Sequence, residues 1–303
     1  MQENILIIGG TGFIGRHLSR QAKLNNFKVT VLSKNILDKI DGIDYKKVNI
    51  ENFEEVELFF KNRSFEYIIN LSGYINHSLF FVNGMSVIKN HFEGILNIIR
   101  CLNRNKLKHF IHIGSSDEYG NNKSPQKENI RESPISPYAF AKTSCSHFLQ
   151  MLNQTEDFPV TILRLFLTYG PGQSFDRFLP FIIKQCILKN SFPVSKGNQI
   201  RDFCFISDVV DGILKTLHSK STFGQIINLA SGRPVSVKRV ILLVKKLIGT
   251  GKPDFGSINY RVGENMSLYA NISKANKLLN WKPCVSLEEG ITQTIESYKK
   301  NFK

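Results

Sequence analysis

A short apolar stretch that runs directly into three regularly spaced glycines constrains this chain more than any other feature. Residues 5–8 are apolar, Gly9, Gly12 and Gly15 follow, and an amphipathic pattern covers residues 13–24. Glycine has no Cβ, so this spacing permits a tight turn, close approach of a pyrophosphate and packing of a helix on a strand. The N–H groups at the helix N-terminus would face the anion. The pattern predicts a strand, turn and helix of a dinucleotide site, the alternative being an ordinary turn.

Composition limits the class of protein. The chain has 303 residues, 42% of them hydrophobic and 21% charged, which predicts a globular protein of one extended domain or two closely joined ones. No apolar run approaches the roughly 20 residues that span a bilayer, and the N-terminal apolar run is only a strand long. We therefore expect a cytoplasmic protein without membrane insertion.

The formal charge of +15 could indicate nucleic acid, an acidic surface or small polyanionic ligands. Lysines and arginines are spread along the chain, with pairs in turns and on polar faces rather than in one basic arm. This distribution predicts a solvated surface that attracts anionic substrates, and no nucleic-acid partner. The five cysteines are scattered without CxxC spacing, so we expect no disulfide framework and no metal site, and read them as buried small hydrophobes.

Strand-like runs alternate with helical patterns through the first half of the chain. The runs cover residues 5–8, 28–32, 67–71, 110–113 and 160–165, and a long helix is predicted over 85–104. Such βαβ repetition implies an α/β fold, a Rossmann-type doubly wound parallel sheet with helices on both faces.

The alternation fades after Tyr169-Gly170-Pro171-Gly172, where a smaller mixed α/β C-terminal lobe is predicted to begin. We expect a dinucleotide-binding domain over 1–168 and a substrate lobe over 169–303, with segments such as 203–230 returning to the first domain. Helices are predicted near 178–188, 207–218 and 236–248, with a strand at 226–229. A terminal helix is predicted to begin at the capping-box pattern Ser286-Leu287-Glu288-Glu289.

Tyr138 and Lys142 lie four residues apart, just after Ser136-Pro137, where proline opens a helix. The spacing puts both side chains on one face. A tyrosine with a pKa near ~10 is a poor base, but an adjacent ammonium and a positively charged nicotinamide would stabilise its phenolate. The pair could then exchange a proton with a sugar or alcohol hydroxyl while hydride passes to or from the cofactor. The alternative is an ordinary helix with a packed tyrosine and a solvated lysine.

A buried-type strand at 110–113 ends in Gly114-Ser115-Ser116-Asp117-Glu118, which places small hydroxyls at the carboxyl edge of the sheet, where ligands bind. Ser116 could hold the reacting oxygen near Tyr138, with Ser115 as the alternate. Asp117 and Glu118 either act as acid and base or stabilise the loop.

Taken together, these motifs resemble the extended short-chain dehydrogenase/reductase family, in its nucleotide-sugar epimerase, dehydratase and reductase branch. The motifs follow in the family's order along essentially the whole chain. The glycine loop, the serine-rich strand end and the Tyr138 and Lys142 pair come first. They are followed by Leu163-Arg164-Leu165-Phe166 and Tyr169-Gly170-Pro171-Gly172, and then by Arg201-Asp202-Phe203, Ile206 and Asp208-Val209.

The resemblance implies a homodimer formed through helices near 88–104 and 138–152. It also implies a site made of three groups of residues. Ser116, Tyr138 and Lys142 would be the catalytic set. Arg201 and Arg261 would approach the nucleotide or diphosphate of a nucleotide diphosphate sugar, as a guanidinium suits phosphate oxygens. The cofactor would contact Gly9, Thr11, Gly12, Phe13, Ile14, Gly15, Ser33, Lys34, Leu71, Tyr138 and Lys142.

Three positions depart from the common pattern of this family. Ser33 and Lys34 stand where an NAD-selective site usually offers an acidic residue, so we predict a preference for NADP(H), with NAD as the alternative. Leu167 stands where relatives commonly have asparagine. The loop at 116–118 reaches its Tyr-Gly one residue sooner than in the 4,6-dehydratases.

Three activities would use this machinery: reduction of a 4-keto-6-deoxy sugar, 4-epimerisation, and 4,6-dehydration. Ser33-Lys34, together with a likeness of residues 197–203 to deoxysugar 4-reductases, favours reduction. An epimerase or dehydratase with tightly held NAD is the alternative. A non-catalytic NADP-sensing protein is a remote one, because such proteins generally dispense with the Tyr/Lys pair.

Overall fold

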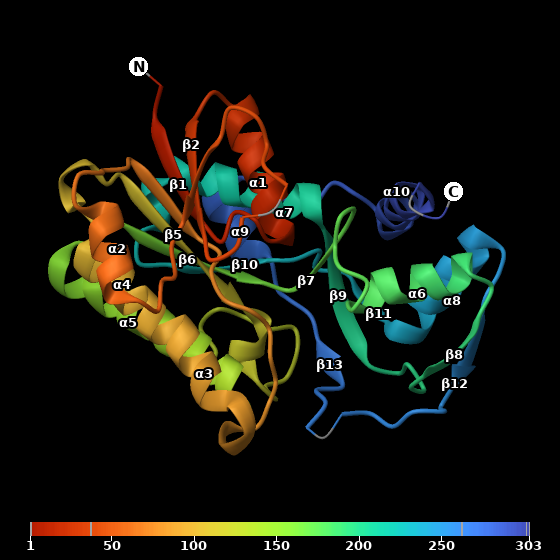
Figure 1. Cartoon of the computed structure of the whole chain (residues 1–303). Helices are drawn as coiled ribbons and strands as arrows, with labels where there is room; N and C mark the ends of the chain where they lie inside the picture. Colours follow the sequence, from red (N-terminus) through yellow and green to blue (C-terminus); the bar gives the residue numbers. More distant parts are fainter. Residues whose placement is uncertain (1, 37, 262, 301, 303) are drawn as a thin grey trace.

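The computed structural model describes residues 2–36, 38–261, 263–300 and 302. Its largest part is a seven-stranded parallel sheet (Figure 1). The strand order is β10-β6-β5-β4-β1-β2-β3. The strands are β1 Asn4–Ile8, β2 Lys28–Ser33, β3 Asp44–Lys47, β4 Tyr67–Asn70, β5 His109–Ser115, β6 Val160–Leu165 and β10 Ile226–Leu229. The predicted α/β fold is confirmed.

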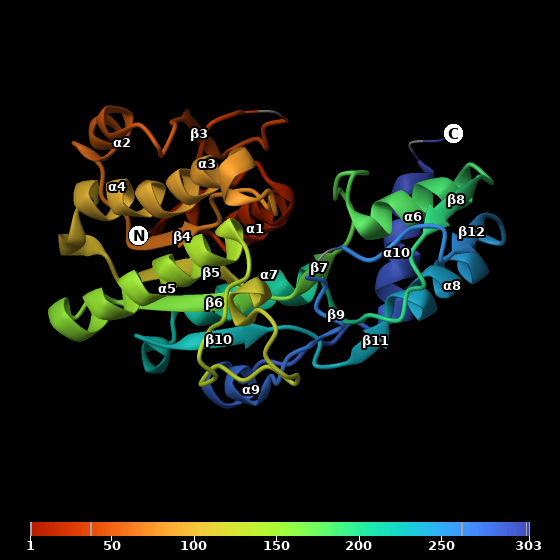
Figure 2. The same ribbon diagram turned by 90° about the horizontal axis from the view of Figure 1, so that it is seen from below.

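Helices cover both faces of the sheet because successive strand residues point to opposite sides. Ile5 and Ile7 pack toward α1 Phe13–Leu24 and α7 Ile206–Leu217, whereas Leu6 and Ile8 pack toward the opposite face. That face is covered by α2 Phe53–Phe60, α4 Gly94–Cys101 and α5 Pro137–Glu156. Figure 2 shows α4 and α5 lying along the sheet.

The order in which successive strands are added to the sheet reverses at β1, which pairs with β2 on one side and with β4 on the other. In doubly wound sheets this point opens a crevice outside the carboxyl ends of the strands, and ligands bind there. The register places Ile8, Asn70 and His112 in one row across β1, β4 and β5. The glycine loop after β1 and the serines at the end of β5 therefore open onto the same edge.

A smaller lobe stands beside this edge (Figures 1 and 2). Its four-stranded sheet is made of β7 Leu167–Tyr169, β9 Ile200–Phe205, β11 Pro234–Ser236 and β13 Ser267–Leu268, and β8 Ser191–Val194 pairs with β12 Lys252–Phe255. Its helices are α6 Phe178–Ile187, α8 Val237–Ile248 and α10 Leu287–Lys299. Between these segments the chain returns to the large sheet as α7 and β10, and later as α9 Ser273–Leu279.

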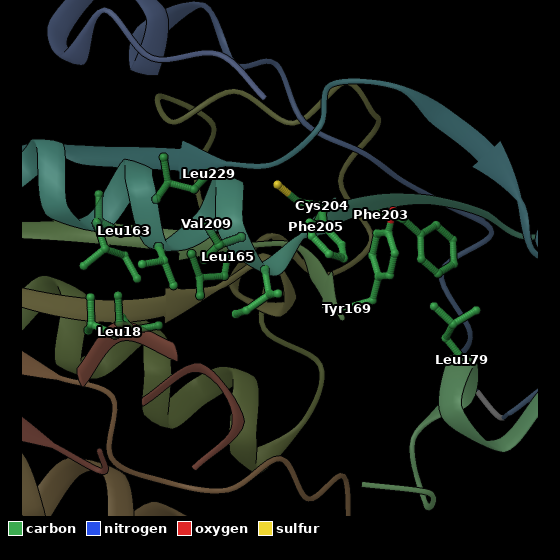
Figure 3. Packing of buried hydrophobic residues seen from close by; sticks show 14 of the residues in the cluster. Leu18, Leu163, Leu165, Tyr169, Leu179, Phe203, Cys204, Phe205, Val209 and Leu229 are labelled. Carbon is green, nitrogen blue, oxygen red and sulfur yellow. The ribbon is translucent and has the colours of Figure 1, made fainter. Parts of the chain in front are cut away.

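The two parts share one hydrophobic core. Figure 3 shows Leu18, Leu163 and Val209 of the large sheet and its helices continuing into Tyr169 and Phe203 of the lobe, and all belong to one buried cluster. Because apolar burial stabilises in proportion to the area removed from water, this cluster fixes the lobe against the sheet.

The helix predicted over 85–104 is interrupted. The segment consists of α3 Met85–Ile88, a π-helical turn over Lys89–Glu93 and α4, and another π-helical turn over Phe80–Gly84 precedes it. Hydrophobic spacing cannot predict such turns, because one inserted residue leaves most of the apolar stripe in place. The terminal helix is confirmed, since the Ser286 hydroxyl caps α10 by accepting from the Glu289 N–H at 3.2 Å.

The cysteines are all free, but only three of them are buried. Cys284 is exposed and Cys101 is half-buried, so the reading of all five as buried hydrophobes is wrong for these two. Cys284 follows a proline in the connection before α10, where little of the chain packs over it. Among the described helices, none is both long and apolar enough to cross a bilayer.

Candidate active site

The glycine loop has the backbone that the sequence predicted. Gly9 has a φ of +80°, and a Cβ there would lie 3.0 Å from the backbone of Leu71. A Cβ on Gly15 would lie 2.5 Å from the Gly9 oxygen, whereas one on Gly12 would meet only that oxygen, at 3.4 Å. Gly9 and Gly15 thus allow the turn and the helix to pack closely, and Gly12 leaves space on the outer side of the loop.

The start of α1 fits the pyrophosphate of a dinucleotide. Within residues 2–36, no side chain caps this helix end at Gly12, and its first turn carries no acidic residue. The N–H groups there, with the positive end of the helix dipole, are therefore available to an anion.

The end of β2, where the adenosine ribose would lie, has charges of both signs. The Ser33 and Thr11 hydroxyls are 2.7 Å apart, and the Lys34 ammonium lies 3.7 Å from the Glu51 carboxylate. Arg16, which the sequence analysis did not single out, pairs with Asp38 at 2.9 Å. The cations that would suit a 2′-phosphate are thus already next to carboxylates.

The structure brings Tyr138 and Lys142 to the carboxyl end of β5. The Ser136 hydroxyl caps α5 by accepting from the Ala139 N–H at 3.1 Å, so Tyr138 lies in the first turn. Both side chains are buried, and the Lys142 ammonium donates to the Ile113 carbonyl at 2.8 Å. The strand that carries the serines therefore also fixes the lysine.

Burial has the largest effect on the pKa of Tyr138. Burial, followed by the charge of Asp117, raises the pKa of Tyr138 well above its usual value, and a hydrogen bond with the Ser115 side chain opposes this. Burial also lowers the pKa of Lys142. Without a nicotinamide, burial thus outweighs the stabilisation of the phenolate by Lys142, and the expected lowering by ammonium and nicotinamide together stays a prediction.

Ser115 and Ser116 have different surroundings. Ser115 caps the 3₁₀ turn Ser116–Tyr119, with its hydroxyl accepting from the Asp117 N–H at 3.1 Å and its own N–H donating to Glu118 at 2.8 Å. Ser116 is buried one residue further on. Ser115, the alternate to Ser116, is the serine whose side chain lowers the pKa of Tyr138 against the effect of burial.

Glu118 is a structural residue. Its carboxylate is fully buried and accepts from the Arg164 Nε at 2.9 Å and from the Ser146 hydroxyl of α5 at 2.8 Å. Arg164 also pairs with Glu132 at 2.5 Å. We call Glu118, Arg164 and Glu132 the inner network. A carboxylate with these partners has no free position for acid–base work on a substrate.

Asp117, one residue earlier, faces the other way. Its carboxylate lies 3.8 Å from the Nε2 of His77, and its side chain is 30% exposed. Burial raises the pKa of Asp117, while His77, Arg201 and Arg261 lower it. The turn therefore sends one carboxylate into the core and the other toward cationic side chains of the lobe.

The two predicted phosphate-binding arginines both lie near Asp117. Arg201 on β9 is mostly buried and pairs with Glu264, and its Nη1 donates to the Ile200 carbonyl at 2.8 Å. Burial lowers the pKa of Arg201, which Glu264 and Asp117 oppose. Arg261 is exposed and precedes residue 262, which lies outside the described residues. The two arginines come from different segments of the lobe and face the same turn.

Three further residues near Tyr138 were not singled out from the sequence. Arg177, at the start of α6, lowers the pKa of Tyr138 through its charge. The rings of His77 and His91 lie edge-on to the tyrosine, with centroids at 5.7 and 5.3 Å. Burial lowers the pKa of His91 to about 3, so this imidazole is neutral. No local pattern marked these residues, because each reaches the site from a separate element.

Leu167, where relatives commonly have asparagine, begins β7 and packs against the shared core. Its apolar side chain offers no hydrogen bond to a phosphate.

A doubly wound sheet with a glycine loop, and a buried Tyr/Lys pair at the same edge, define an oxidoreductase of the extended short-chain dehydrogenase/reductase class. The chain belongs to the NAD dependent epimerase/dehydratase family, whose family model matches residues 5–230. It is therefore an enzyme of the nucleotide-sugar branch of that class.

The similar proteins match nearly the whole of this chain and nearly the whole of their own. A UDP-glucuronate 4-epimerase from Thermodesulfobacterium geofontis is 28% identical over 318 residues, covering 98% of this chain and 97% of its own. The structure of a UDP-glucose 4-epimerase with UDP-glucose from Thermotoga maritima has a TM-score of 0.92 and 26% identity, covering 99% and 100% of the two chains. A UDP-glucuronic acid 4-epimerase from Bacillus cereus, solved with UDP-glucuronic acid and NAD, has a TM-score of 0.88 and 25% identity, covering 98% and 99%.

Proposed function

We propose that this enzyme interconverts the C4 alcohol and C4 ketone of a nucleotide diphosphate sugar with NAD, and that 4-epimerisation is its net reaction. The observation that carries this proposal is the buried pair of Tyr138 and Lys142 at the same sheet edge as the glycine loop, with the charges of Arg201 and Arg261 acting on Asp117 of the neighbouring turn. The names of the relatives support a UDP-sugar and NAD.

Each residue has a role in this reaction. Tyr138 exchanges the proton of the C4 oxygen, and Ser116 orients that oxygen, with Ser115 as the alternate. Lys142 supplies positive charge beneath them. Bound NAD supplies the hydride acceptor. It would be held at the loop by Gly9, Thr11, Gly12, Phe13, Ile14 and Gly15, at its adenosine ribose by Ser33 and Lys34, at its nicotinamide ribose by Lys142, and beside the nicotinamide by Leu71 and Tyr138.

Arg201 and Arg261 bind the diphosphate of the substrate. A guanidinium keeps its charge and makes forked bonds to phosphate oxygens. In this proposal residues 1–168 hold mainly the cofactor and residues 169–303 mainly the nucleotide sugar. The charges of both arginines act on Asp117, so a diphosphate bound to them would direct the sugar toward the turn that carries it.

A second candidate is net reduction of a 4-keto-6-deoxy sugar with NADPH. Ser33 and Lys34 favour it, because a hydroxyl and an ammonium suit a 2′-phosphate. Glu51 and Asp38 stand against it, since their carboxylates already pair with Lys34 and Arg16.

One experiment separates the two candidates. Nucleotides are released from gently purified protein and identified by mass spectrometry, and the protein is then incubated with UDP-glucose or UDP-glucuronic acid without added cofactor. We expect retained NAD and formation of the C4 epimer. Exchangeable cofactor with a preference for NADPH, and no epimer, would support the reductase instead.

We also propose a homodimer formed through residues 88–104 and 138–152. Phe140 and Met151 of α5 are 52% and 44% exposed, and their spacing of eleven residues places them on one face of the helix. Light scattering should give twice the chain mass, and Phe140→Glu should lower it to that of one chain.

A further inference from the structure

We propose that His77 and Asp117 form a second proton-transfer pair, which removes and returns hydrogen at a carbon next to the C4 carbonyl of the sugar. The inference rests on the proposed function, because it takes a C4 ketone as its substrate. It adds an activity at carbon to the exchange at oxygen by Tyr138.

The geometry places this pair beside the reacting oxygen. The His77 ring stands edge-on to the Tyr138 ring at 5.7 Å, and its Nε2 is 3.8 Å from the Asp117 Oδ2. That separation is too long for a hydrogen bond but allows an ion pair. The three side chains come from the segment after β4, the turn after β5 and the start of α5, and meet at the carboxyl edge of the sheet.

The pair is open to a ligand, whereas the neighbouring candidates are not. The side chains of His77 and Asp117 are 42% and 30% exposed. His91 is buried, with its Nε2 3.1 Å from the Tyr74 carbonyl oxygen. Glu118 is enclosed in the inner network. Among the described acid–base groups around Tyr138, His77 and Asp117 are therefore the ones that a sugar can reach.

The distances suit a carbon adjacent to C4. With the C4 oxygen at Tyr138, the neighbouring ring carbons lie one bond, about 1.5 Å, from C4. Their hydrogens are acidified by the carbonyl. A base on the neighbouring wall of the site, such as His77, can reach them while the tyrosine keeps its contact with the oxygen.

The proposed step is balanced without any redox change. The C–H bond breaks, its proton passes to a ring nitrogen of His77, and its electron pair forms a C=C bond as the carbonyl pair moves onto O4. The Asp117 carboxylate stabilises the imidazolium, and the hydroxyls of Tyr138 and Ser116 donate to the enolate oxygen. Return of a proton from the imidazole, after exchange with solvent, restores the ketone.

The test supplies the ketone directly, so that hydride transfer is not needed. UDP-4-keto-6-deoxyglucose is incubated with the full-length protein in D₂O, and deuterium at C3 and C5 is followed by proton NMR and mass spectrometry. We expect the wild type to exchange at least one of these hydrogens about a hundredfold faster than the enzyme-free buffer. His77→Asn and His77→Gln should both lose this acceleration, and Asp117→Asn should lower it about tenfold.

The matched control is His218→Asn, which alters an exposed histidine beside Tyr67, far from the carboxyl edge of the sheet. It should exchange at the wild-type rate. Tyr138→Phe should lose interconversion at C4 and should also slow the exchange, because it removes one of the two hydroxyls that donate to the enolate oxygen. Thermal melting of each variant shows whether it is folded, and two His77 variants guard against a folding defect in one.

The failures of the two proposals are distinguishable. Wild-type exchange no faster than buffer, or undiminished exchange in both folded His77 variants, would overturn the inference while leaving C4 interconversion in place. Absence of C4 interconversion with any UDP-sugar, with exchange present, would overturn the proposed function instead.

Discussion

The inner and outer sides of the turn at residues 115–119 differ in what neighbouring carboxylates do. On the inner side, Glu118 is fully buried against Arg164 and ties the turn to α5 through Ser146. On the outer side, Asp117 is partly exposed and faces His77 and the arginines of the lobe. We call Asp117 with His77, Arg201 and Tyr138 the outer face.

This difference teaches that adjacency in sequence does not imply a shared role. A 3₁₀ turn has about three residues per turn, so successive side chains point in different directions. From the sequence, both carboxylates could act as acid and base or stabilise the loop. The structural alternative is confirmed for Glu118, and the role of Asp117 stays a proposal.

The largest expected effect is on the inner network. Arg164→Ala should lower the free energy of unfolding by about 3–5 kcal/mol, because it leaves the buried charge of Glu118 uncompensated. Urea denaturation measures this. The double variant Arg164→Met/Glu118→Leu should recover part of the loss, since no lone charge remains. A loss under about 1 kcal/mol in Arg164→Ala would contradict the assignment of this side to stability.

On the outer face, Tyr138→Phe should lower the turnover of C4 interconversion by about 10²–10³-fold, because it removes the hydroxyl that exchanges the proton. Its free energy of unfolding should change by less than about 1.5 kcal/mol, as only one hydrogen bond is lost. Kinetics and urea denaturation on the same sample give both values. Undiminished turnover would sink the proposed role of this residue. Tyr119→Phe, which alters the buried tyrosine bonded to Asn228, is the matched control and should keep its turnover.

Arg201→Ala should weaken binding of UDP about 10- to 100-fold, since hydrogen bonds to charged groups contribute about 1.5–3 kcal/mol. Calorimetric titration with UDP checks this, and Arg201→Lys should be intermediate because a point charge replaces a fork. Arg239→Ala removes an exposed arginine of α8 and should bind UDP as the wild type does. Equal affinities of Arg201→Ala and wild type would remove this residue from the proposed substrate site.

The smallest effect expected is an opposite pH dependence of stability on the two sides. Burial raises the pKa of Asp117 in the folded state, so the folded protein loses stability as pH rises through this value. Asp117→Asn should therefore be more stable than wild type at neutral pH, with the gain vanishing below about pH 4.

Glu132 should show the reverse. Burial alone would raise its pKa, but the hydrogen bond and charge of Arg164 lower the pKa of Glu132 overall. Its contribution is present above the ordinary carboxyl range and is lost as pH falls through the folded value. Glu132→Gln should thus be less stable than wild type at neutral pH and equal to it in acid. Parallel pH profiles of the two variants in urea denaturation would contradict the comparison.

Much of the fold could be predicted from local patterns. The strand and glycine loop before α1, the buried strands and the Ser286 cap all depend on residues close in sequence, so spacing and propensity suffice. The sheet of the lobe could not be predicted in this way. Its strands β11 and β13 are short and lie far along the chain from β9, and only their pairing with β9 makes them strands.

The features of the site likewise fall into those that local spacing predicts and those that it does not. The positions of Tyr138 and Lys142 on one helix face followed from their spacing. The partner of Glu118 did not, because Arg164 is 46 residues away. The approach of His77 to Tyr138 could not be predicted from spacing either, because the segment after β4 carries no periodic signal and is placed only by packing against other elements.

The sequence by itself determined the dinucleotide loop, the alternating sheet and the residue types that the chemistry needs, because these depend on short-range sterics and hydrophobic periodicity. Only the tertiary structure decided which carboxylate is buried against Arg164 and which histidines lie against Tyr138. These follow from contacts between residues distant in the chain, where burial and charge are set by neighbours that no local pattern contains.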